Sequence, residues 1–370
     1  MKKTFFFIIF LMTSTVLLSQ HACKYVHYKG SIYEDVELQA DMTFMNGDIT
    51  GYYTYAFERP WDSIHRMSVT GARAEVQGYE KGQEVVFYEW AEGDTGAVFR
   101  GQVTAQGHLS GTYRPAGRKG ESRFEMQPTY PSGTLPFRAY CLEEEKILSA
   151  APGSPKAAVS LTLLVPGSET SQELQDYLTG IILEEYAPGM EDEDPETILE
   201  KIRQTFFRQY VNANTDIWQE GHSFNWIKER HASIYFNRDH ILTFRIYNYA
   251  FTGGAHGLAS LEYLILDTRG KRELDTTSLF IPGFGDKITP LIMEKLRDKY
   301  GLDHTTPLTS AGFFSDTVRP NNNLFINEMG LGFHYNHYEI APYAMGMIEV
   351  HFSLPELKGL LRKDAVLMGQ

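Results

Sequence analysis

The hydrophobic period of the chain changes at a proline-rich stretch, and this change constrains the fold more than any other feature. Pro128, Pro131 and Pro136 exclude a helix here and interrupt any central strand. Before the stretch, short apolar runs alternate and are punctuated by glycine, whereas beyond it helical and strand periods are mixed. The predicted organisation is an N-terminal domain over residues 23–130, a linker over 131–138 and a second domain over 139–370.

The N-terminal domain is predicted to be all-β. Strand patterns at 47–53, 85–90 and 107–113 are separated by turn residues. Short alternating strands with regular turns are typical of a meander that forms a sandwich or a barrel. Gly51 and Gly111 each lie inside a strand pattern, which indicates a bulge or a bend at both positions.

The second domain is predicted to be α+β, an antiparallel sheet with packed helices. Helices are expected from Thr170–Glu173, which resembles a capping box, from Asp194–Pro195, from Thr289–Pro290 and from Ser353. Strands are expected over 233–247 with a turn at 237–239, over 258–266, over 324–335 with a turn at 328–330, and over 347–352. An alternative divides this domain into subdomains 139–240 and 241–370.

The N-terminus predicts export. Lys2 and Lys3 precede an uncharged, apolar run from Phe5 to Leu18. This run is shorter than the roughly 20 residues that span a bilayer and has the length of a signal-peptide core. We therefore expect residues 1–22 to be a signal peptide. The expected location is the periplasm, or the outer membrane or cell surface as a lipoprotein.

The two cysteines, Cys23 and Cys141, have three interpretations. An even number of cysteines in an oxidising compartment favours a disulfide. Alternatively, Cys23 is lipidated after cleavage behind Ala22, which would be the chain's one contact with a membrane. The third interpretation is that Cys141 is buried as a small apolar residue. Lipidation and the disulfide exclude each other, because both use the sulfur of Cys23.

The charge of the chain limits the class of partner. It carries 34 Lys and Arg against 47 Asp and Glu, a formal net charge of −13. Nucleic-acid binding needs clustered basic residues, so we expect no nucleic-acid partner. A negative surface would attract a basic partner, or would simply keep the protein soluble.

The candidate site combines a glycine turn with a later segment rich in aromatic and titratable residues. The turn, Thr252–Gly257, contains two adjacent glycines, which mark a backbone conformation that other residues disfavour. The later segment, Phe333–Gly346, turns at a proline. The candidate binding residues are His256, His337, Tyr338, Glu339 and Tyr343, and the candidate turn residues are Gly253, Gly254, Gly257 and Pro342.

Several chemistries fit these residues. If the later segment is extended, His337 and Glu339 project to one face, and with His256 they could hold zinc or act in acid–base catalysis. In the structural alternative, which we favour, His256 bonds to backbone groups beside the turn. We therefore expect no catalytic residue, no metal and no cofactor.

Two further segments have alternative interpretations. The acidic run over 191–194 is expected to be a solvated loop, because Pro195 and a missing glycine do not fit a calcium-binding loop. Tyr247, Tyr249 and Phe251 alternate, so they either line a groove for a sugar or peptide or belong to the sheet core.

From about Ala139 onward, the chain resembles the RsiV/PdaC-type C-terminal domain, and the TGGAHG turn and the 333–346 segment carry the resemblance. That domain has no established activity and occurs in a lysozyme-sensing anti-sigma factor and beside peptidoglycan deacetylases. The resemblance implies an envelope protein that binds a glycan or a basic protein such as lysozyme. A glycan-acting enzyme is the alternative, but the chain has no His-Glu-x-x-His, Gly-x-Ser-x-Gly or phosphate-loop motif.

Overall fold

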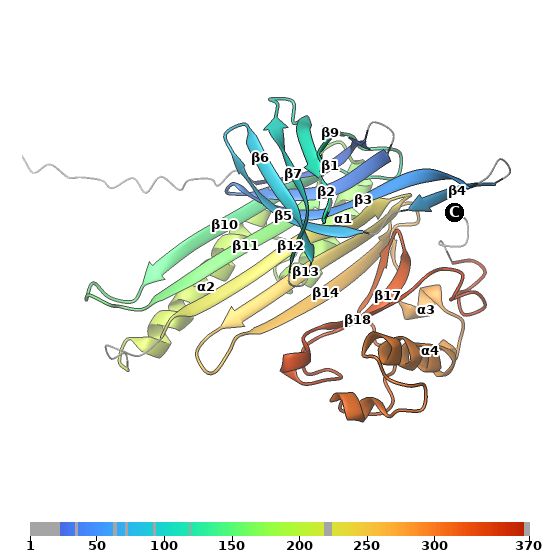
Figure 1. Ribbon diagram of the computed structural model, residues 1–370. Coiled ribbons are helices and arrows are strands. Elements are labelled where there is room, and N and C mark those ends of the chain that lie inside the picture. The colour runs from blue at the N-terminus through green and yellow to red at the C-terminus, as the bar shows by residue number, and fades with distance from the viewer. Residues whose placement is uncertain are drawn as a thin grey trace, which may run out of the picture.

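The computed structural model describes residues 23–33, 36–61, 65–70, 73–91, 94–117, 120–217 and 224–365. The N-terminal run on which the export prediction rests lies outside these residues. Within them, no helix combines the length and the apolar character needed to cross a membrane. The chain forms a barrel, a central sheet backed by two helices, and a C-terminal region beside the last long strand of that sheet (Figure 1).

The N-terminal domain is an antiparallel barrel. Eight strands close in the order β2-β1-β9-β8-β7-β6-β5-β3, and β3 pairs back to β2. β4 extends β3 as a hairpin outside the closed ring. The strands are β1 Cys23–Ile32, β2 Val36–Met45, β3 Asp48–Trp61, β4 His65–Thr70, β5 Ala74–Lys81, β6 Glu84–Ala91, β7 Asp94–Val103, β8 Leu109–Arg114 and β9 Ser122–Pro128. Of the two predicted all-β architectures, the barrel is the one observed.

Aromatic side chains fill the barrel interior. The rings of Phe87 and Phe99 stack with centroids 4.5 Å apart, and Phe124 meets Phe99 edge-on at 5.2 Å. A small barrel is closed tightly enough for inward side chains to fill it. Gly101 and Gly111 face each other across β7 and β8, where a Cβ on Gly111 would lie 2.5 Å from the Cα of Gly101. Gly111, which was predicted to mark a bulge or a bend, therefore permits close approach of two strands.

The central sheet has the order β10-β11-β12-β13-β14-β15. Its strands are β10 Phe137–Ile147, β11 Lys156–Pro166, β12 Trp226–Arg238, β13 Ile241–Phe251, β14 Leu258–Asp267 and β15 Arg272–Glu273. All neighbours are antiparallel except β11 and β12, and the parallel crossover between them contains α1 Gln172–Tyr186 and α2 Pro195–Asn214. A division at residue 240 falls in the turn between β12 and β13, so strands of one sheet lie on both sides of it.

The C-terminal region is a small antiparallel sheet, β16-β17-β18, packed with helices around its own core. Its elements are α3 Thr276–Leu279, α4 Phe284–Lys299, the short 3₁₀ turn η1 Leu308–Ala311, β16 Leu324–Asn327, β17 Gly330–Tyr335, η2 Tyr343–Met345 and β18 Ile348–Phe352. With the central sheet and its helices, this region makes the second domain α+β, as predicted.

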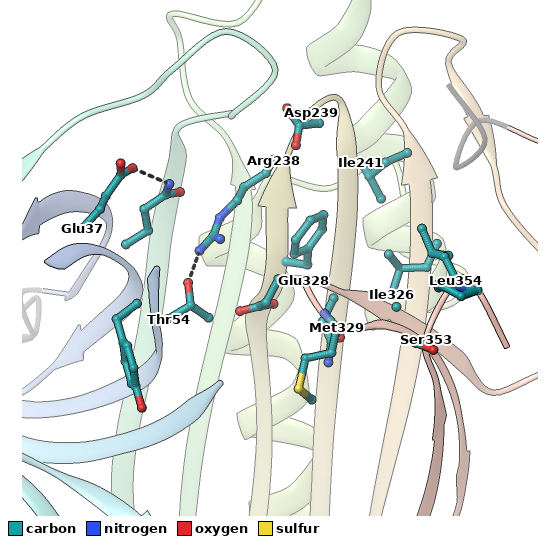
Figure 2. A pocket seen from close by; sticks show the side chains of 16 residues that line it. Glu37, Thr54, Arg238, Asp239, Ile241, Ile326, Glu328, Met329, Ser353 and Leu354 are labelled. Atoms are coloured by element: carbon teal, nitrogen blue, oxygen red, sulfur yellow. Dashed lines mark hydrogen bonds between the residues drawn. The ribbon is translucent and has the colours of Figure 1, made fainter. Parts of the chain in front are cut away.

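The barrel and the C-terminal region meet the sheet on the face opposite α1 and α2. There the guanidinium of Arg73 stacks between the rings of Tyr52 and Tyr235, 3.7 and 3.9 Å from their centroids, and pairs with Glu328 at 3.1 Å. These four residues come from the barrel, β12 and the β16–β17 turn. Beside them the three regions line an open cavity of about 450 Å³ (Figure 2).

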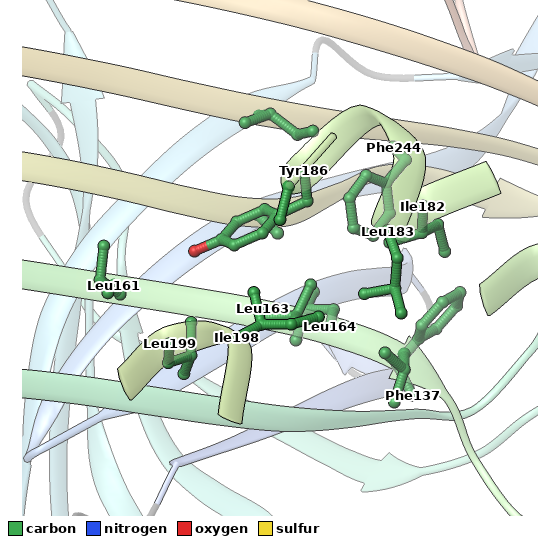
Figure 3. Close-up of a cluster of buried hydrophobic side chains, with 14 of the residues drawn as sticks. Phe137, Leu161, Leu163, Leu164, Ile182, Leu183, Tyr186, Ile198, Leu199 and Phe244 are labelled. Atoms are coloured by element: carbon green, nitrogen blue, oxygen red, sulfur yellow. The ribbon is translucent and has the colours of Figure 1, made fainter. Parts of the chain in front are cut away.

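The largest core lies between the central sheet and the two crossover helices (Figure 3). β11 contributes Leu161 and Leu163, α1 contributes Ile182, and α2 contributes Ile198, all fully buried. Each such side chain stabilises the fold by about 1.5–3 kcal/mol relative to an exposed position. This core holds the sheet rigid, and its strands carry the candidate site on their far face and at their ends.

Helix starts follow the sequence signals in one case and depart from them in two. Asp194 caps α2 by accepting a hydrogen bond from the Thr197 amide, with Pro195 at the first helical position, as predicted. The capping box expected at Thr170–Glu173 does not form, since Ser171 is the N-cap and makes no side-chain cap bond. α4 begins at Phe284, so Pro290, expected near its start, lies inside the helix.

Two other local expectations are corrected. The β12–β13 turn consists of Asp239 and His240, both with positive φ, because Asn237 stays in the strand and its side chain bonds to Leu135. No helix follows Ser353. The Glu356 carboxylate accepts from the Ser353 amide and hydroxyl at 2.8 and 2.7 Å, yet successive turns replace the helix and end at a glycine with φ 86°.

A disulfide joins Cys23 of β1 to Cys141 of β10, with Cα atoms 6.2 Å apart. It therefore links the barrel to the central sheet. Tyr25, two residues further along β1, is buried against Phe137 of β10 with ring centroids 5.7 Å apart. Its hydroxyl donates to Asp41 at 2.6 Å. The first barrel strand is thus fastened to the second domain by a covalent bond and by a shared core.

Candidate functional site

The glycine turn links β13 to β14. Gly253 and Gly254 have φ of 103° and 96°, and a Cβ on either would meet no atom within 4 Å. Glycine is therefore favoured at both positions by the positive φ of the backbone, and not by crowding around a side chain. Gly257 differs, because a Cβ there would lie 2.4 Å from the ring of Tyr249. It is small so that the tyrosine can pack on the backbone.

Four of the predicted residues form one aromatic stack, which we call the aromatic platform: His256, His337, Tyr338 and Tyr343. The ring of Tyr343 lies between His256, with centroids 4.1 Å apart and an interplanar angle of 22°, and His337, at 4.3 Å and 20°. The Tyr338 hydroxyl lies 3.3 Å from Nε2 of His256. The fold thus brings two segments some 80 positions apart in sequence into direct ring contact.

A local turn orients Tyr338. β17 ends at Tyr335, and the chain then turns until Pro342 leads into η2. Tyr338 itself has φ 65°, which is uncommon for a bulky residue, and its side chain is 50% exposed. Residues held in such conformations concentrate at functional sites because the surrounding structure must fix them. This geometry lays the tyrosine ring open to solvent beside His256.

Glu339 does not join the platform, which corrects the expectation of an extended segment. Its carboxylate accepts from the Asn321 side-chain amide and from the backbone N–H of Asn336, at 2.7 and 2.9 Å. Because the segment turns, His337 and Glu339 point in different directions. The side chains of His256, His337 and Glu339 therefore do not converge, as a zinc site or an acid–base pair would require. In the described ranges, no group of three or more His, Cys, Asp or Glu side chains is placed to hold a metal.

The two platform histidines have different surroundings. Nδ1 of His256 lies 2.8 Å from the carbonyl of Gly257, in keeping with the expected bond to a backbone group beside the turn. Burial lowers the pKa of His337, a hydrogen bond with Tyr343 opposes the shift, and the nearby His256 adds to it. With its pKa below the ordinary value, His337 is neutral at pH 7.

The sheet face beside the platform carries the alternating tyrosines. Tyr247 and Tyr249 are half-buried on the side away from α1 and α2, whereas Phe244 and Ile246 belong to the core on the helix side. The ring of His231 stacks on Tyr247 at 6.4 Å. Burial lowers the pKa of His231 to about 4, so this ring too is neutral at pH 7. Tyr247 and Tyr249 therefore line a surface, and Phe251, also half-buried, extends it.

His334, which the sequence places on the other side of its segment, has a structural role. It is fully buried, with Nδ1 at 3.0 Å from Glu349 and Nε2 at 3.3 Å from Asn336. Tyr263 also donates to Glu349, at 3.2 Å. Burial alone would raise the pKa of Glu349. The hydrogen bonds and charge of these partners lower it by more, so the pKa lies below its ordinary value and the carboxylate stays ionised. The pair fixes β17 against β18.

Sequence reasoning missed the cavity of Figure 2. It lies at the β12–β13 turn, whereas the platform lies at the β13–β14 turn, so the two sites flank opposite ends of β13. Its lining comes from the barrel, the hairpin turn, the β16–β17 turn and the segment after β18. No spacing within one segment could have indicated it, because no two of these segments are adjacent in sequence.

Comparisons with known proteins match one part of the chain to a family of unknown function. Residues 277–354 match the family model described as "Protein of unknown function (DUF3298)", a span that contains most of the platform and excludes the glycine turn. No curated protein matches the chain. These findings give neither an activity nor a ligand. They also leave the RsiV/PdaC-type assignment as an expectation.

Two solved structures are similar to the chain. A DUF3298 family member from Bacteroides fragilis is 21% identical with a TM-score of 0.59, and the match covers 64% of this chain and 97% of that one. A DUF3298 family protein from Pseudomonas aeruginosa is 18% identical with a TM-score of 0.44, covering 61% and 95%. The first of these shows a shared fold.

Proposed function

We propose that this protein is a binding module of the cell envelope and that its ligand, a glycan, rests on the aromatic platform. One observation carries the proposal: Tyr343 is clamped between two histidines while Tyr338 stands half-exposed beside them. Folding normally hides such rings, so an ordered, exposed aromatic cluster marks an interaction site. The envelope setting rests on the signal-peptide prediction and on the resemblance to the RsiV/PdaC-type domain.

The chemistry of the platform suits a sugar. Its rings offer flat apolar faces for the C–H faces of a pyranose, and the Tyr338 hydroxyl and Nε2 of His256 offer polar tips for hydroxyl groups. Tyr247 and Tyr249 extend the aromatic surface along β13. The neutral ring of His337 adds no charge that a neutral glycan would have to desolvate.

A basic protein is the second candidate, and the net charge of −13 favours it. Lys and Arg side chains also bind the faces of tyrosine rings. Attraction between opposite net charges weakens as salt increases, whereas stacking of a neutral sugar does not. Salt dependence therefore separates the two candidates. A glycan-acting enzyme has less support, because Glu339 is committed to Asn321 and Asn336.

The test is titration calorimetry with a soluble N-acetylglucosamine tetramer as the glycan probe and lysozyme as the basic-protein probe. Tyr338→Asn removes the ring but keeps a residue that tolerates positive φ. We expect it to weaken binding of the tetramer at least tenfold, and we expect binding to change little between about 20 and 300 mM salt.

The matched control is Tyr79→Asn, because Tyr79 is a barrel tyrosine that is 43% exposed and lies outside the platform. This control variant should bind the tetramer with the affinity of the wild type. If both variants lost the same amount of affinity for the tetramer, or if Tyr338→Asn lost none, a binding site on the platform would be contradicted. Binding of lysozyme alone, weakened by salt, would replace the glycan with the basic protein.

A further inference from the structure

The cavity at the β12–β13 turn has the size and lining of a small-molecule site. Its volume of about 450 Å³ lies within the range of roughly 300–1,000 Å³ that such sites occupy. Figure 2 shows Arg238 extending from β12 toward Thr54 of the barrel, with Ile326 and Leu354 on the C-terminal side. One side of the cavity is thus polar and the other apolar.

The acidic side chains of the lining are mostly neutralised. Glu328 pairs with buried Arg73 at 3.1 Å. Glu37 pairs with Lys29 at 2.8 Å, and this partner lowers the pKa of Glu37 against the effect of burial. Asp239 is exposed at the rim. No strong negative charge is therefore left to repel an anion from the polar side.

Arg238 is a lining charge without a carboxylate in contact with it, although its charge is among the causes that lower the pKa of Glu37 and of Asp41. Its guanidinium donates to the Thr54 hydroxyl at 3.1 Å, and its Nε is buried with no hydrogen-bond partner. Across the part of the chain that the structure describes, no ion pair within 4.0 Å involves Arg238. A guanidinium has five donors in a rigid fork that matches a carboxylate.

Three other arginines share the buried Nε of Arg238 but not its lack of strong acceptors. Arg73, Arg203 and Arg230 also have a buried, unpartnered Nε. Each of them, however, has stronger acceptors elsewhere on the guanidinium: Glu328 and a carbonyl for Arg73, Glu144 and Glu200 for Arg203, and Asn248 and a carbonyl for Arg230. Arg238 has a single neutral hydroxyl. Its unused donors, at the wall of a cavity, are those that a ligand would fill.

We propose that this cavity binds a small molecule in which a carboxylate adjoins an apolar group. Arg238 receives the carboxylate, and the apolar group lies against Ile326 and Leu354. A short fatty acid and the C-terminus of an apolar peptide share this chemistry. Because the lining comes from the barrel, the central sheet and the C-terminal region, the ligand would fasten the three together. The site is separate from the aromatic platform and does not depend on its function.

The experiment records methyl NMR spectra and calorimetry on the chain from residue 23 with four probes. Hexanoate and N-acetyl-leucine carry the carboxylate, whereas hexanol and N-acetyl-leucine amide lack it. We expect at least one acid to bind and to shift the methyl signals of Ile241 and Ile326, which line the cavity, while Ile198 in α2 stays unchanged. Binding of hexanoate alone would point to a fatty acid, and binding of N-acetyl-leucine alone to a peptide terminus.

Variants test the role of the guanidinium. Arg238→Gln should weaken binding of the acid at least tenfold, whereas Arg208→Gln, which removes the same charge from an exposed position on α2, should not. If Arg238→Gln unfolds the protein, Leu354→Trp, which narrows the apolar side, should abolish binding with Arg238 intact. The proposal is overturned if the neutral probes bind as tightly as the acids, if Arg238→Gln binds like the wild type, or if no acid binds.

Discussion

The backbone positions the rings of the platform. Tyr338 has φ 65°, and the two glycines opposite have φ of 103° and 96°. The positive φ of the glycines could be predicted from the sequence, because two adjacent glycines between strands indicate a backbone conformation that other residues disfavour. The conformation of Tyr338 was not, since a tyrosine carries no such signal. Its conformation depends on the turn after β17 and on the contact with His256.

Gly254→Ala should destabilise the protein by about 1 kcal/mol or more. The added methyl group meets no atom, so the whole cost comes from holding alanine at positive φ. Urea unfolding monitored by circular dichroism measures the change. Gly180→Ala is the control, because Gly180 lies exposed inside α1 and alanine should there stabilise by up to about 1 kcal/mol. A stabilising Gly254→Ala would contradict a strained turn.

At the scale of elements, local signals predicted the structure where they agreed with tertiary packing. Asp194–Pro195 starts α2 because cap, proline and apolar stripe coincide there. Thr289–Pro290 gave a wrong start for α4, which begins at Phe284. The apolar stripe of this helix consists of Ile288, Ile292 and Leu296, all fully buried, and it begins before the proline. Burying that stripe outweighs the loss of one helical hydrogen bond at Pro290.

Pro290→Ala should therefore stabilise the protein, by about 1–3 kcal/mol. The proline is exposed, and alanine would restore the N–H that the helix lacks at this position. Thermal unfolding should show a higher Tm for the variant. Pro282→Ala serves as the comparison, because this exposed proline precedes the helix and its replacement should give no gain. Equal effects at both positions would show that α4 does not extend through Pro290.

At the scale of the whole molecule, the sequence predicted the parts better than their assembly. β9 ends at Pro128 and β10 begins at Phe137, and the domain boundary placed between them stays a prediction. The way the parts meet depends on contacts between residues far apart in the chain, such as Arg73 with Glu328, Tyr25 with Phe137, and Arg238 with Thr54. Patterns within one segment carry no information about such pairs. This is why the platform, built from two recognisable segments, was predictable in part, and the cavity was not.

The disulfide is the covalent part of that assembly, and removing it should cost about 4–5 kcal/mol. It closes a loop with a sequence separation of 118 residues, and long loops lose the most chain entropy in the unfolded state when they are closed. Guanidinium unfolding of Cys141→Ser measures the loss. The double variant Cys23→Ser/Cys141→Ser should unfold at the same denaturant concentration as the single one, because both remove one bond. Mass spectrometry of the wild-type protein gives the independent check. A diacylglyceryl group on Cys23 would exclude the bond. The chain would then be held to a membrane, and non-covalent contacts such as those of Tyr25, Arg73 and Arg238 would fasten its barrel to the sheet.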